Sequence, residues 1–80
     1  DAEPKLALAA ALNKNNLGNT KSISLAKEAL SLNPNYVSYK HQEEQLWGGK
    51  LQEATKELFK NPNLEVSIKK AFENSSYENN

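Results

Sequence analysis

Cysteine, methionine and arginine are all missing from this chain of 80 residues. Without cysteine the chain forms neither a disulfide framework nor a thiolate metal site. The absence of cysteine does not identify the cellular compartment of the protein, and we favour the cytoplasm. All ten basic residues are lysine, so no arginine offers planar, bidentate recognition of phosphate or guanine. We therefore expect no nucleic-acid partner. Because the chain begins at Asp1, we also expect an excised domain or a processed product.

A net charge and a long apolar run are missing as well. Ten acidic and ten basic residues balance, so no overall field draws the chain to nucleic acid or to an anionic membrane. No stretch approaches the ~18 apolar residues of a membrane span, and we expect no membrane insertion. Hydrophobic residues make up 38% of the chain, which predicts marginal stability for one small domain.

One sequence pattern occurs twice, 28 residues apart. Apolar residues at i, i+3 and i+7 form one helix stripe. An Asn-Pro-Asn then ends the helix, because the residue before proline is pushed out of the helical region. A fixed offset of this kind indicates stacked helical units. The first copy comprises Ile23, Ala26, Leu30 and 32–35, and the second comprises Leu51, Ala54, Leu58 and 60–63.

Further start and stop signals predict five short helices. Pro4 suits a first helical turn, and Gly18 and the Gly48-Gly49 pair mark turns. We therefore predict an all-α fold in a single domain over residues 1–74, with 75–80 as a flexible tail. The expected helices are 3–13, 20–32, 36–47, 50–60 and 63–73, arranged as two antiparallel hairpins and a C-terminal sealing helix.

Four expectations concern single residues near the turns. We expect Leu17 to lie buried beneath the first turn. Trp47 should lie in the core between the third and fourth helices, with its indole NH bound to a turn carbonyl or water. We expect Asn35 to cap the third helix, and Asn61 or Asn63 to cap the last.

The Ala-Leu-Ser-Leu-Asn-Pro-Asn stretch at 29–35 resembles the close of a tetratricopeptide repeat. The resemblance implies paired antiparallel helices stacked into a right-handed superhelix whose concave face grips peptides. The 28-residue unit is shorter than the family period of about 34. A generic helical bundle, another helical repeat and the prenyltransferase-subunit repeat are the alternatives. The matching residues are Gly18, Ala26, Ala29, Leu30, Leu32 and Pro34, then Gly49, Leu51, Ala54, Leu58 and Pro62.

Ser38, His41 and Gln45 form a polar stripe at i, i+3 and i+7 on the predicted third helix. In a tetratricopeptide-like array this stripe would line the concave groove. We predict that these three residues, together with Lys69, contact a peptide or helix of a partner protein. A solvated helix face is the alternative interpretation.

Lysines near the predicted groove suggest one specific ligand group. The carboxylate-clamp tetratricopeptide domains bind a partner's C-terminal carboxylate. Lys69 and Lys70, with Lys40 nearby if the helices stack, are candidates to bind such a carboxylate, but only Lys5 and Asn13 resemble the Lys and Asn of that clamp. No arginine is present to strengthen it.

No residue pattern in the chain indicates catalysis, a metal or a cofactor. His41 is the single histidine and has no second ligand at metal-binding spacing. The glutamate pairs lie among lysines and glutamines, whereas a general acid needs an apolar pocket. We predict a non-catalytic protein-interaction or scaffolding module, and the sequence does not indicate its oligomeric state. The alternative is a structural helical segment that docks on other domains of a larger protein or enzyme.

Overall fold

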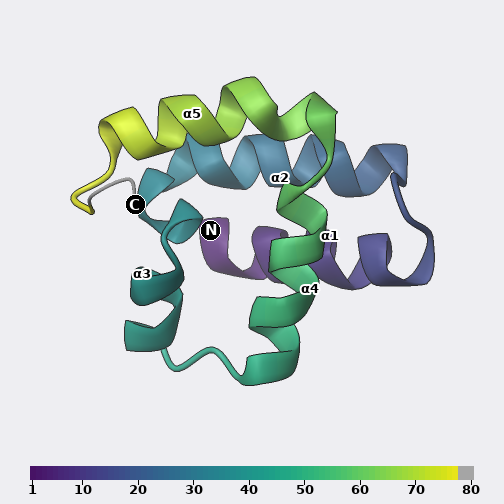
Figure 1. The fold of residues 1–80 in the computed structure, drawn as a ribbon, viewed down its shortest axis with the longest axis horizontal. Coiled ribbons are helices and arrows are strands. Elements are labelled where there is room, and N and C mark those ends of the chain that lie inside the picture. The colour runs from purple at the N-terminus through teal and green to yellow at the C-terminus, as the bar shows by residue number, and fades with distance from the viewer. Residues whose placement is uncertain (78–80) are drawn as a thin grey trace.

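The computed structural model describes residues 1–77, and this range contains five α-helices and no strand. Helices α1 and α2 run in opposite directions as a hairpin, α5 lies along α2, and α4 runs across α1 (Figure 1). The predicted all-α class is confirmed. The α-helices are α1 Ala2–Asn15, α2 Thr20–Leu32, α3 Tyr39–Glu44, α4 Gly49–Phe59 and α5 Glu65–Asn74, and the 3-10 helices are η1 Pro34–Val37 and η2 Pro62–Leu64.

Small residues bring α1 and α2 close together. Ala9, Ala26 and Ala29 are fully buried in the hairpin. The hydroxyl of Ser22, itself buried, donates a hydrogen bond of 2.6 Å to the carbonyl oxygen of Ala9 on the other helix. Because alanine side chains are short, the two backbones approach closely enough for this bond. The small side chains of these alanines therefore set the close spacing of α1 and α2.

The turn between α1 and α2 is organised by asparagines. The side-chain oxygen of Asn13 accepts from the amide of Gly18 at 2.9 Å, and Asn19 caps α2 by accepting from two backbone amides. Gly18 has a φ of 76°, which favours glycine. The expectation of a buried Leu17 is wrong, because its side chain is 76% exposed. Asn13 is itself buried beneath the turn, and Leu17 points outward.

Both Asn-Pro-Asn stretches fold in the same way, so the predicted helix stops are confirmed. The side chains of Asn33 and Asn61 accept from the amides of Asn35 and Asn63, at 3.0 and 2.8 Å. Each following proline begins a short 3-10 helix. The expectation that Asn35 caps α3 is wrong. Its side chain accepts from the amide of Ser76 instead.

The third helix is shorter than the predicted 36–47. The Asn33-Pro34 turn first places residues 34–37 in η1, and Ser38 then caps α3 by accepting from the amide of His41 at 3.3 Å. The helix ends before Leu46, which has a left-handed φ of 65° and an exposed side chain. This residue turns the chain so that Trp47 returns to the core.

The burial of Trp47 confirms its predicted place in the core. Its ring stacks on that of Tyr36 with centroids 5.6 Å apart. The indole NH donates to Oε2 of Glu3 at 3.1 Å, in place of the turn carbonyl or water that we expected. The Tyr36 hydroxyl donates to Oε1 of the same carboxylate at 2.9 Å. Glu3 therefore ties the start of α1 to two aromatic residues far along the chain.

Two buried glutamines connect α3 to α4. Gln42 Nε2 donates to the carbonyl oxygen of Tyr36 at 2.8 Å, and Gln52 Nε2 lies 3.1 Å from the carbonyl oxygen of Tyr39 and 3.3 Å from Gln42 Oε1. The two helices run in opposite directions (Figure 1), but α4 packs on α1. The second hairpin is thus irregular, and the right-handed superhelix is not confirmed.

Part of the predicted tail makes defined contacts. Ser76 donates its amide to Asn35 at 2.9 Å, and the Tyr77 hydroxyl lies 3.0 Å from Nδ1 of His41. Residues 75–77 thus fold back on η1 and α3. The remainder of the expected tail, 78–80, lies outside the described residues.

Candidate functional site: a groove centred on Phe72

The four residues predicted to contact a partner do not share one surface. Because the third helix is broken at Ser38, Ser38 and His41 do not lie on one continuous polar stripe. Ser38 is buried and its hydroxyl caps α3. His41 is half-buried within an aromatic cluster, and Gln45 is exposed just after the helix. Lys69 lies apart from them, exposed on α5.

Two open cavities meet at Phe72, and we call the surface that they form the Phe72 groove. The first has a volume of about 670 Å³ and lies between η1, α3 and residues 76–77. The second, of about 320 Å³, lies where α4 meets η2 and α5. Ser38 and Lys69 thus line adjoining cavities. Phe72 lines both; the other lining residues are Val37, Ser38, Tyr39, Lys40, Ser76 and Tyr77 in the first, and Phe59, Lys60, Asn61, Pro62, Glu65, Ile68 and Lys69 in the second.

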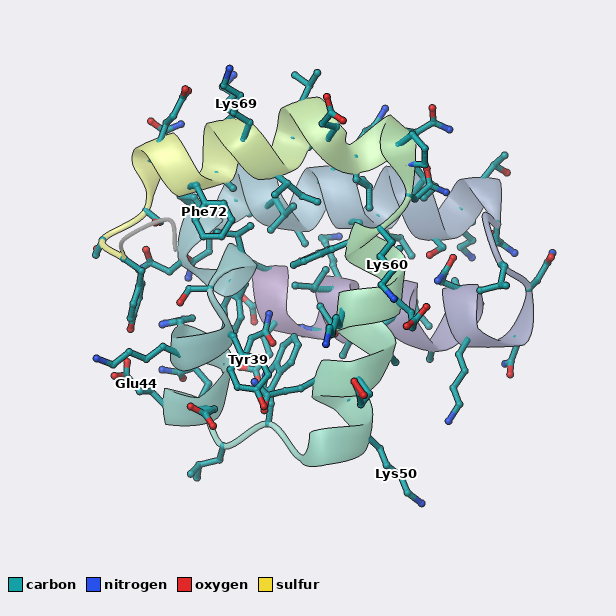
Figure 2. The ribbon with its side chains drawn as sticks, in the orientation of Figure 1. Tyr39, Glu44, Lys50, Lys60, Lys69 and Phe72 are labelled. Carbon is teal, nitrogen blue, oxygen red and sulfur yellow. The ribbon has the colours of Figure 1, made fainter. Side chains whose placement is uncertain are left out.

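The groove has an apolar floor. Phe59, Ile68 and Phe72 are half-buried and pack against the core with one side while they line the cavities with the other. Figure 2 shows Phe72 and Tyr39 on the same face of the molecule. Exposed apolar surface of this kind, bordered by polar residues, is typical of protein-interaction sites.

The rim of the groove is positively charged. Three lysines, Lys40, Lys60 and Lys69, line it against one carboxylate, Glu65. Lys60 Nζ lies 2.9 Å from Oε1 of Glu57, and no ion pair within residues 1–77 involves Lys40 or Lys69. Lys69 extends outward from α5 (Figure 2). The ammonium groups of Lys40 and Lys69 are therefore available to an acidic ligand.

His41 belongs to a row of aromatic rings beside the groove. Its ring meets that of Tyr36 edge-on at 4.6 Å and that of Tyr77 at 5.4 Å. The Tyr77 hydroxyl bonds to His41 Nδ1 and also to Glu44, and the Glu44 hydrogen bond raises the pKa of Tyr77. His41 Nε2 is buried, with no partner among residues 1–77. His41 is therefore a packed residue whose partner is an aromatic side chain.

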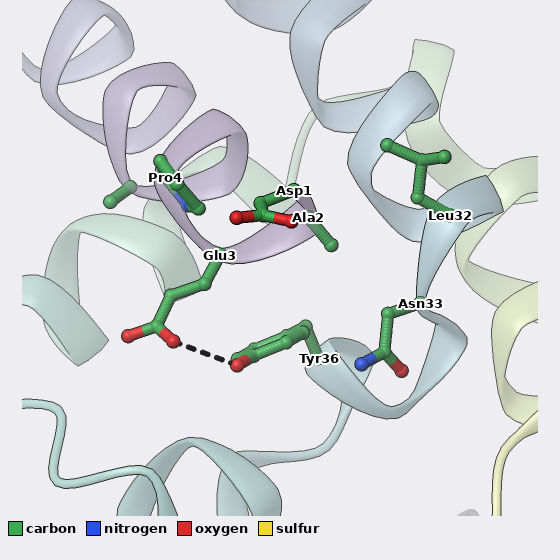
Figure 3. A pocket seen from close by; sticks show the side chains of 8 residues that line it. Asp1, Ala2, Glu3, Pro4, Leu32, Asn33 and Tyr36 are labelled. Atoms are coloured by element: carbon green, nitrogen blue, oxygen red, sulfur yellow. Dashed lines mark hydrogen bonds between the residues drawn. The ribbon is translucent and has the colours of Figure 1, made fainter.

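A larger cavity, of about 750 Å³, opens at the start of α1 (Figure 3). Asp1, Glu3, Asn33 and Tyr36 supply most of its polar surface. The Glu3 carboxylate is already occupied by the Tyr36 hydroxyl and the Trp47 indole NH. Burial, followed by this hydrogen bond to Glu3, raises the pKa of Tyr36. The polar groups here stabilise the fold and leave little to recognise a ligand.

The glutamates that lie near one another in the sequence are exposed to solvent. Glu44, Glu53 and Glu57 are exposed, whereas a general acid needs a carboxyl group buried in apolar surroundings. In the part of the chain that the structure describes, no three His, Cys, Asp or Glu side chains are placed to hold a metal ion.

Sequence reasoning missed the polar residues of the interior. Asn13, Gln42 and Gln52 are buried, each with a hydrogen-bond partner. For Asn13 the signal was present, because an asparagine five residues before a turn glycine can bind its amide. The glutamines carry no such local signal, because their partners lie on other elements.

Two further observations complete the description of the site. None of the helices within residues 1–77 combines the length and apolar character needed to cross a membrane. The chain matches no protein-family model, no curated protein and no solved structure, so the geometry described above carries the functional argument.

Proposed function

We propose that the chain is a non-catalytic protein-interaction module that binds an acidic segment of a partner protein in the Phe72 groove. The observation that carries this proposal is one surface with both an apolar floor and two rim lysines that form no ion pair within residues 1–77. Phe72 joins the two cavities, and Lys40 and Lys69 lie one in each. The partner segment has aromatic or aliphatic anchors for the floor and Asp or Glu for the rim.

Burial of the anchors supplies most of the affinity in this proposal. Each Å² of apolar surface removed from water contributes about 25 cal/mol, so one well-seated aromatic or aliphatic anchor contributes about 1.5–3 kcal/mol. The lysines add less energy, but they speed association with an acidic segment and disfavour basic ones. Phe72 is the central anchor contact, because it lines both cavities.

The four residues proposed from the sequence have different roles in this binding mode. Lys69 contributes charge at the rim, and Ser38 lines the first cavity while its hydroxyl caps α3. His41 acts through Tyr77, which closes one end of the groove. Gln45 lies outside the lining residues and contributes only to a partner that extends beyond α3.

Selection from a random peptide library, followed by measured affinities, tests the proposal. We expect the selected peptides to combine Phe, Tyr or Leu with Asp and Glu. Reversing both rim charges, with Lys40→Glu and Lys69→Glu, should weaken binding about tenfold, because two exposed ion pairs contribute about 1–2 kcal/mol together. Raising the salt concentration should weaken binding to the original chain but not to this variant.

A matched control separates the groove from net charge. Lys21→Glu with Lys56→Glu makes the same charge change at exposed positions that line neither cavity. We expect its affinity for the selected peptides to stay within about twofold of the original. Equal losses in the two double variants, or a selection without acidic peptides, would show that the groove is not the binding site.

The tetratricopeptide resemblance stays a prediction within this proposal. It is supported by the antiparallel α1–α2 pair, by the left-handed turn at Gly18 and by the stop at Pro34. The proposed partner-binding and scaffolding role is that of such repeats, but the Phe72 groove is argued from its own residues and does not depend on the family.

A structural segment that docks on other domains is the second candidate, and exposed leucines favour it. Leu17 and Leu46 are 76% and 90% exposed, each at the tip of a connection. Leu17 also borders an open cavity of about 410 Å³ beside Ala54. Thermal unfolding with a hydrophobic dye distinguishes the candidates. A self-contained module melts cooperatively without dye binding, whereas a docking segment gives a broad transition and binds the dye when folded.

A further inference from the structure

Ser75–Tyr77, which we call the strap, is held to the body of the molecule by polar contacts. The amide of Ser76 donates to Oδ1 of Asn35 at 2.9 Å. The amide of Tyr77 donates to the hydroxyl oxygen of Ser75 at 3.2 Å, which bends the strap back toward α3. The strap therefore follows a defined path and ends with the Tyr77 ring beside the groove.

The Tyr77 hydroxyl is bound from two sides. An ionised carboxylate only accepts hydrogen bonds, so the hydroxyl donates to Oε1 of Glu44. Its oxygen then accepts from Nδ1–H of His41, at 3.0 Å. This pattern assigns the proton of the neutral imidazole to Nδ1. Together, Asn35, His41 and Glu44 form what we call the tyrosine site.

The strap contributes little to the core. The buried apolar residues end at Ala71, while Ser76 is exposed and both Ser75 and Tyr77 are half-buried. What holds the strap is a few hydrogen bonds near the surface, each of which stabilises it only modestly because water can replace it. A segment held in this way opens far more often than the whole domain unfolds.

The strap also occupies one end of the Phe72 groove. Ser76 and Tyr77 line the first cavity together with Lys40 and Phe72. The sequence around the strap has glutamates on both sides, at 73 and 78. A tyrosine that glutamates flank in the sequence therefore lines the same cavity as Lys40.

We propose that the tyrosine site is a binding site for a tyrosine-bearing acidic segment of a partner, and that the strap fills it from within until the partner displaces it. This proposal rests on the proposed function, because the tyrosine site adjoins the Phe72 groove and supplies one anchor position for the same ligand. It names that anchor as tyrosine, and it makes the strap an autoinhibitory contact.

The chemistry of the site selects a hydroxyl group. With phenylalanine in place of tyrosine, Glu44 loses a donor and His41 Nδ1–H loses an acceptor. A site built to hydrogen-bond a hydroxyl discriminates against the analogue that lacks it, because its own polar groups are then left unpaired. The discrimination is moderate here, since water reaches the exposed side of Glu44.

The test adds the strap sequence to the protein as a separate peptide. A capped peptide with the sequence of residues 73–80 is titrated into the full chain carrying Tyr77→Ala, and the amide NMR signals of Asn35, His41 and Glu44 are followed. We expect saturable shifts with this variant and about tenfold weaker binding to the original chain, whose own strap competes. The same peptide with phenylalanine for tyrosine should bind several-fold more weakly.

The two proposals fail in different ways. Absence of saturable shifts in the Tyr77→Ala chain, or equal binding to both chains, refutes the tyrosine site. The groove peptides are read separately through the amide signals of Lys69 and Phe72. We expect them to bind Tyr77→Ala several-fold more tightly than the original chain; unchanged affinity there refutes the autoinhibitory role while leaving the groove intact. Lys56→Ala, at an exposed position that lines neither cavity, is the control and should leave peptide binding to the tyrosine site unchanged.

Discussion

Removing the Glu3 carboxylate should destabilise the fold more than any other exposed acidic side chain would. Glu3 is exposed in the first turn of α1, yet it accepts hydrogen bonds from Tyr36 and Trp47, which are both buried. These bonds join the start of the chain to residues 33 and 44 positions further along. Glu3→Ala therefore leaves two donors without a partner at the edge of the core.

The expected loss follows from three contributions. A hydrogen bond to a charged group contributes about 1.5–3 kcal/mol, and we take ~1 kcal/mol for each because water can replace part of a half-exposed bond. The carboxylate also favours the positive end of the α1 dipole by ~0.3–1 kcal/mol. Glu3→Ala should thus lower the free energy of unfolding by about 2–3 kcal/mol. In a domain of this size, each kcal/mol lowers the Tm by about 4–8 °C.

Urea unfolding provides the measurement. Circular dichroism is the signal to monitor, because the fluorescence of Trp47 changes when its hydrogen bond to Glu3 is lost. Glu28→Ala is the matched control. Glu28 is exposed and its Oε1 lies 2.8 Å from Lys5 Nζ, and such a surface ion pair should contribute far less than the Glu3 hydrogen bonds. A double-mutant cycle of Glu3→Ala with Tyr36→Phe should give a coupling energy of ~1 kcal/mol.

Two results would refute this reasoning. One is a loss for Glu3→Ala no greater than that for Glu28→Ala, which would mean that solvent satisfies both donors at no cost. The other is additivity between Glu3→Ala and Tyr36→Phe, which would mean that the 2.9 Å contact contributes nothing. Glu3→Gln refines the test, because glutamine keeps one acceptor. It should lower the free energy of unfolding by about half as much as Glu3→Ala does.

Four further predictions address the turns, the titrating groups and the polar interior. Gly18→Ala should lower stability by ~1 kcal/mol in a thermal melt, since an alanine at φ 76° is strained; no change would mean that the turn relaxes. Leu46→Asn should raise stability by about 0.5–1 kcal/mol, because asparagine tolerates a left-handed backbone better than leucine; a loss would instead point to a packing role for Leu46. Burial and then the Glu3 hydrogen bond raise the pKa of Tyr36 above its ordinary 10.0, so its stabilising effect is present below that pH and declines as the pH rises through the folded-state pKa. Urea titrations at alkaline pH should show this decline in the original chain and less of it in Tyr36→Phe. Gln52→Leu should lower stability by about 1–3 kcal/mol by leaving buried acceptors without a donor, and a neutral result in urea would mean that the interior repacks.

The helices could be predicted from the sequence because their signals are local. The Asn33-Pro34 and Asn61-Pro62 pairs end α2 and α4 as expected, since a proline restricts the residue before it wherever the chain goes. The expected last helix, 63–73, also forms, as η2 followed by α5, with Leu64 and Ala71 buried. Local rules suffice when the deciding interactions lie within a few residues.

The third helix could not be predicted in the same way. Residues 36–47 have no proline or glycine, so local propensity favours one continuous helix. The structure breaks it at Ser38 because Tyr36 and Trp47 both turn toward Glu3 at the start of α1. On a straight helix their rings could not stack, since 11 residues with a rise of about 1.5 Å each would hold them about 16 Å apart along the axis. A contact distant in sequence therefore overrides the helix propensity of the intervening residues.

The break in this helix also decides where the candidate site lies. On a continuous helix, Ser38, His41 and Gln45 would share a face. Once Ser38 caps α3, its hydroxyl is occupied, and His41 turns toward Tyr36 and Tyr77. The first cavity of the Phe72 groove then arises between elements about thirty residues apart, so no spacing within either element indicates it. The same argument explains the strap: the polar composition of residues 75–77 predicts a solvated tail, but Asn35 and Glu44 supply partners that make a polar segment stay in place.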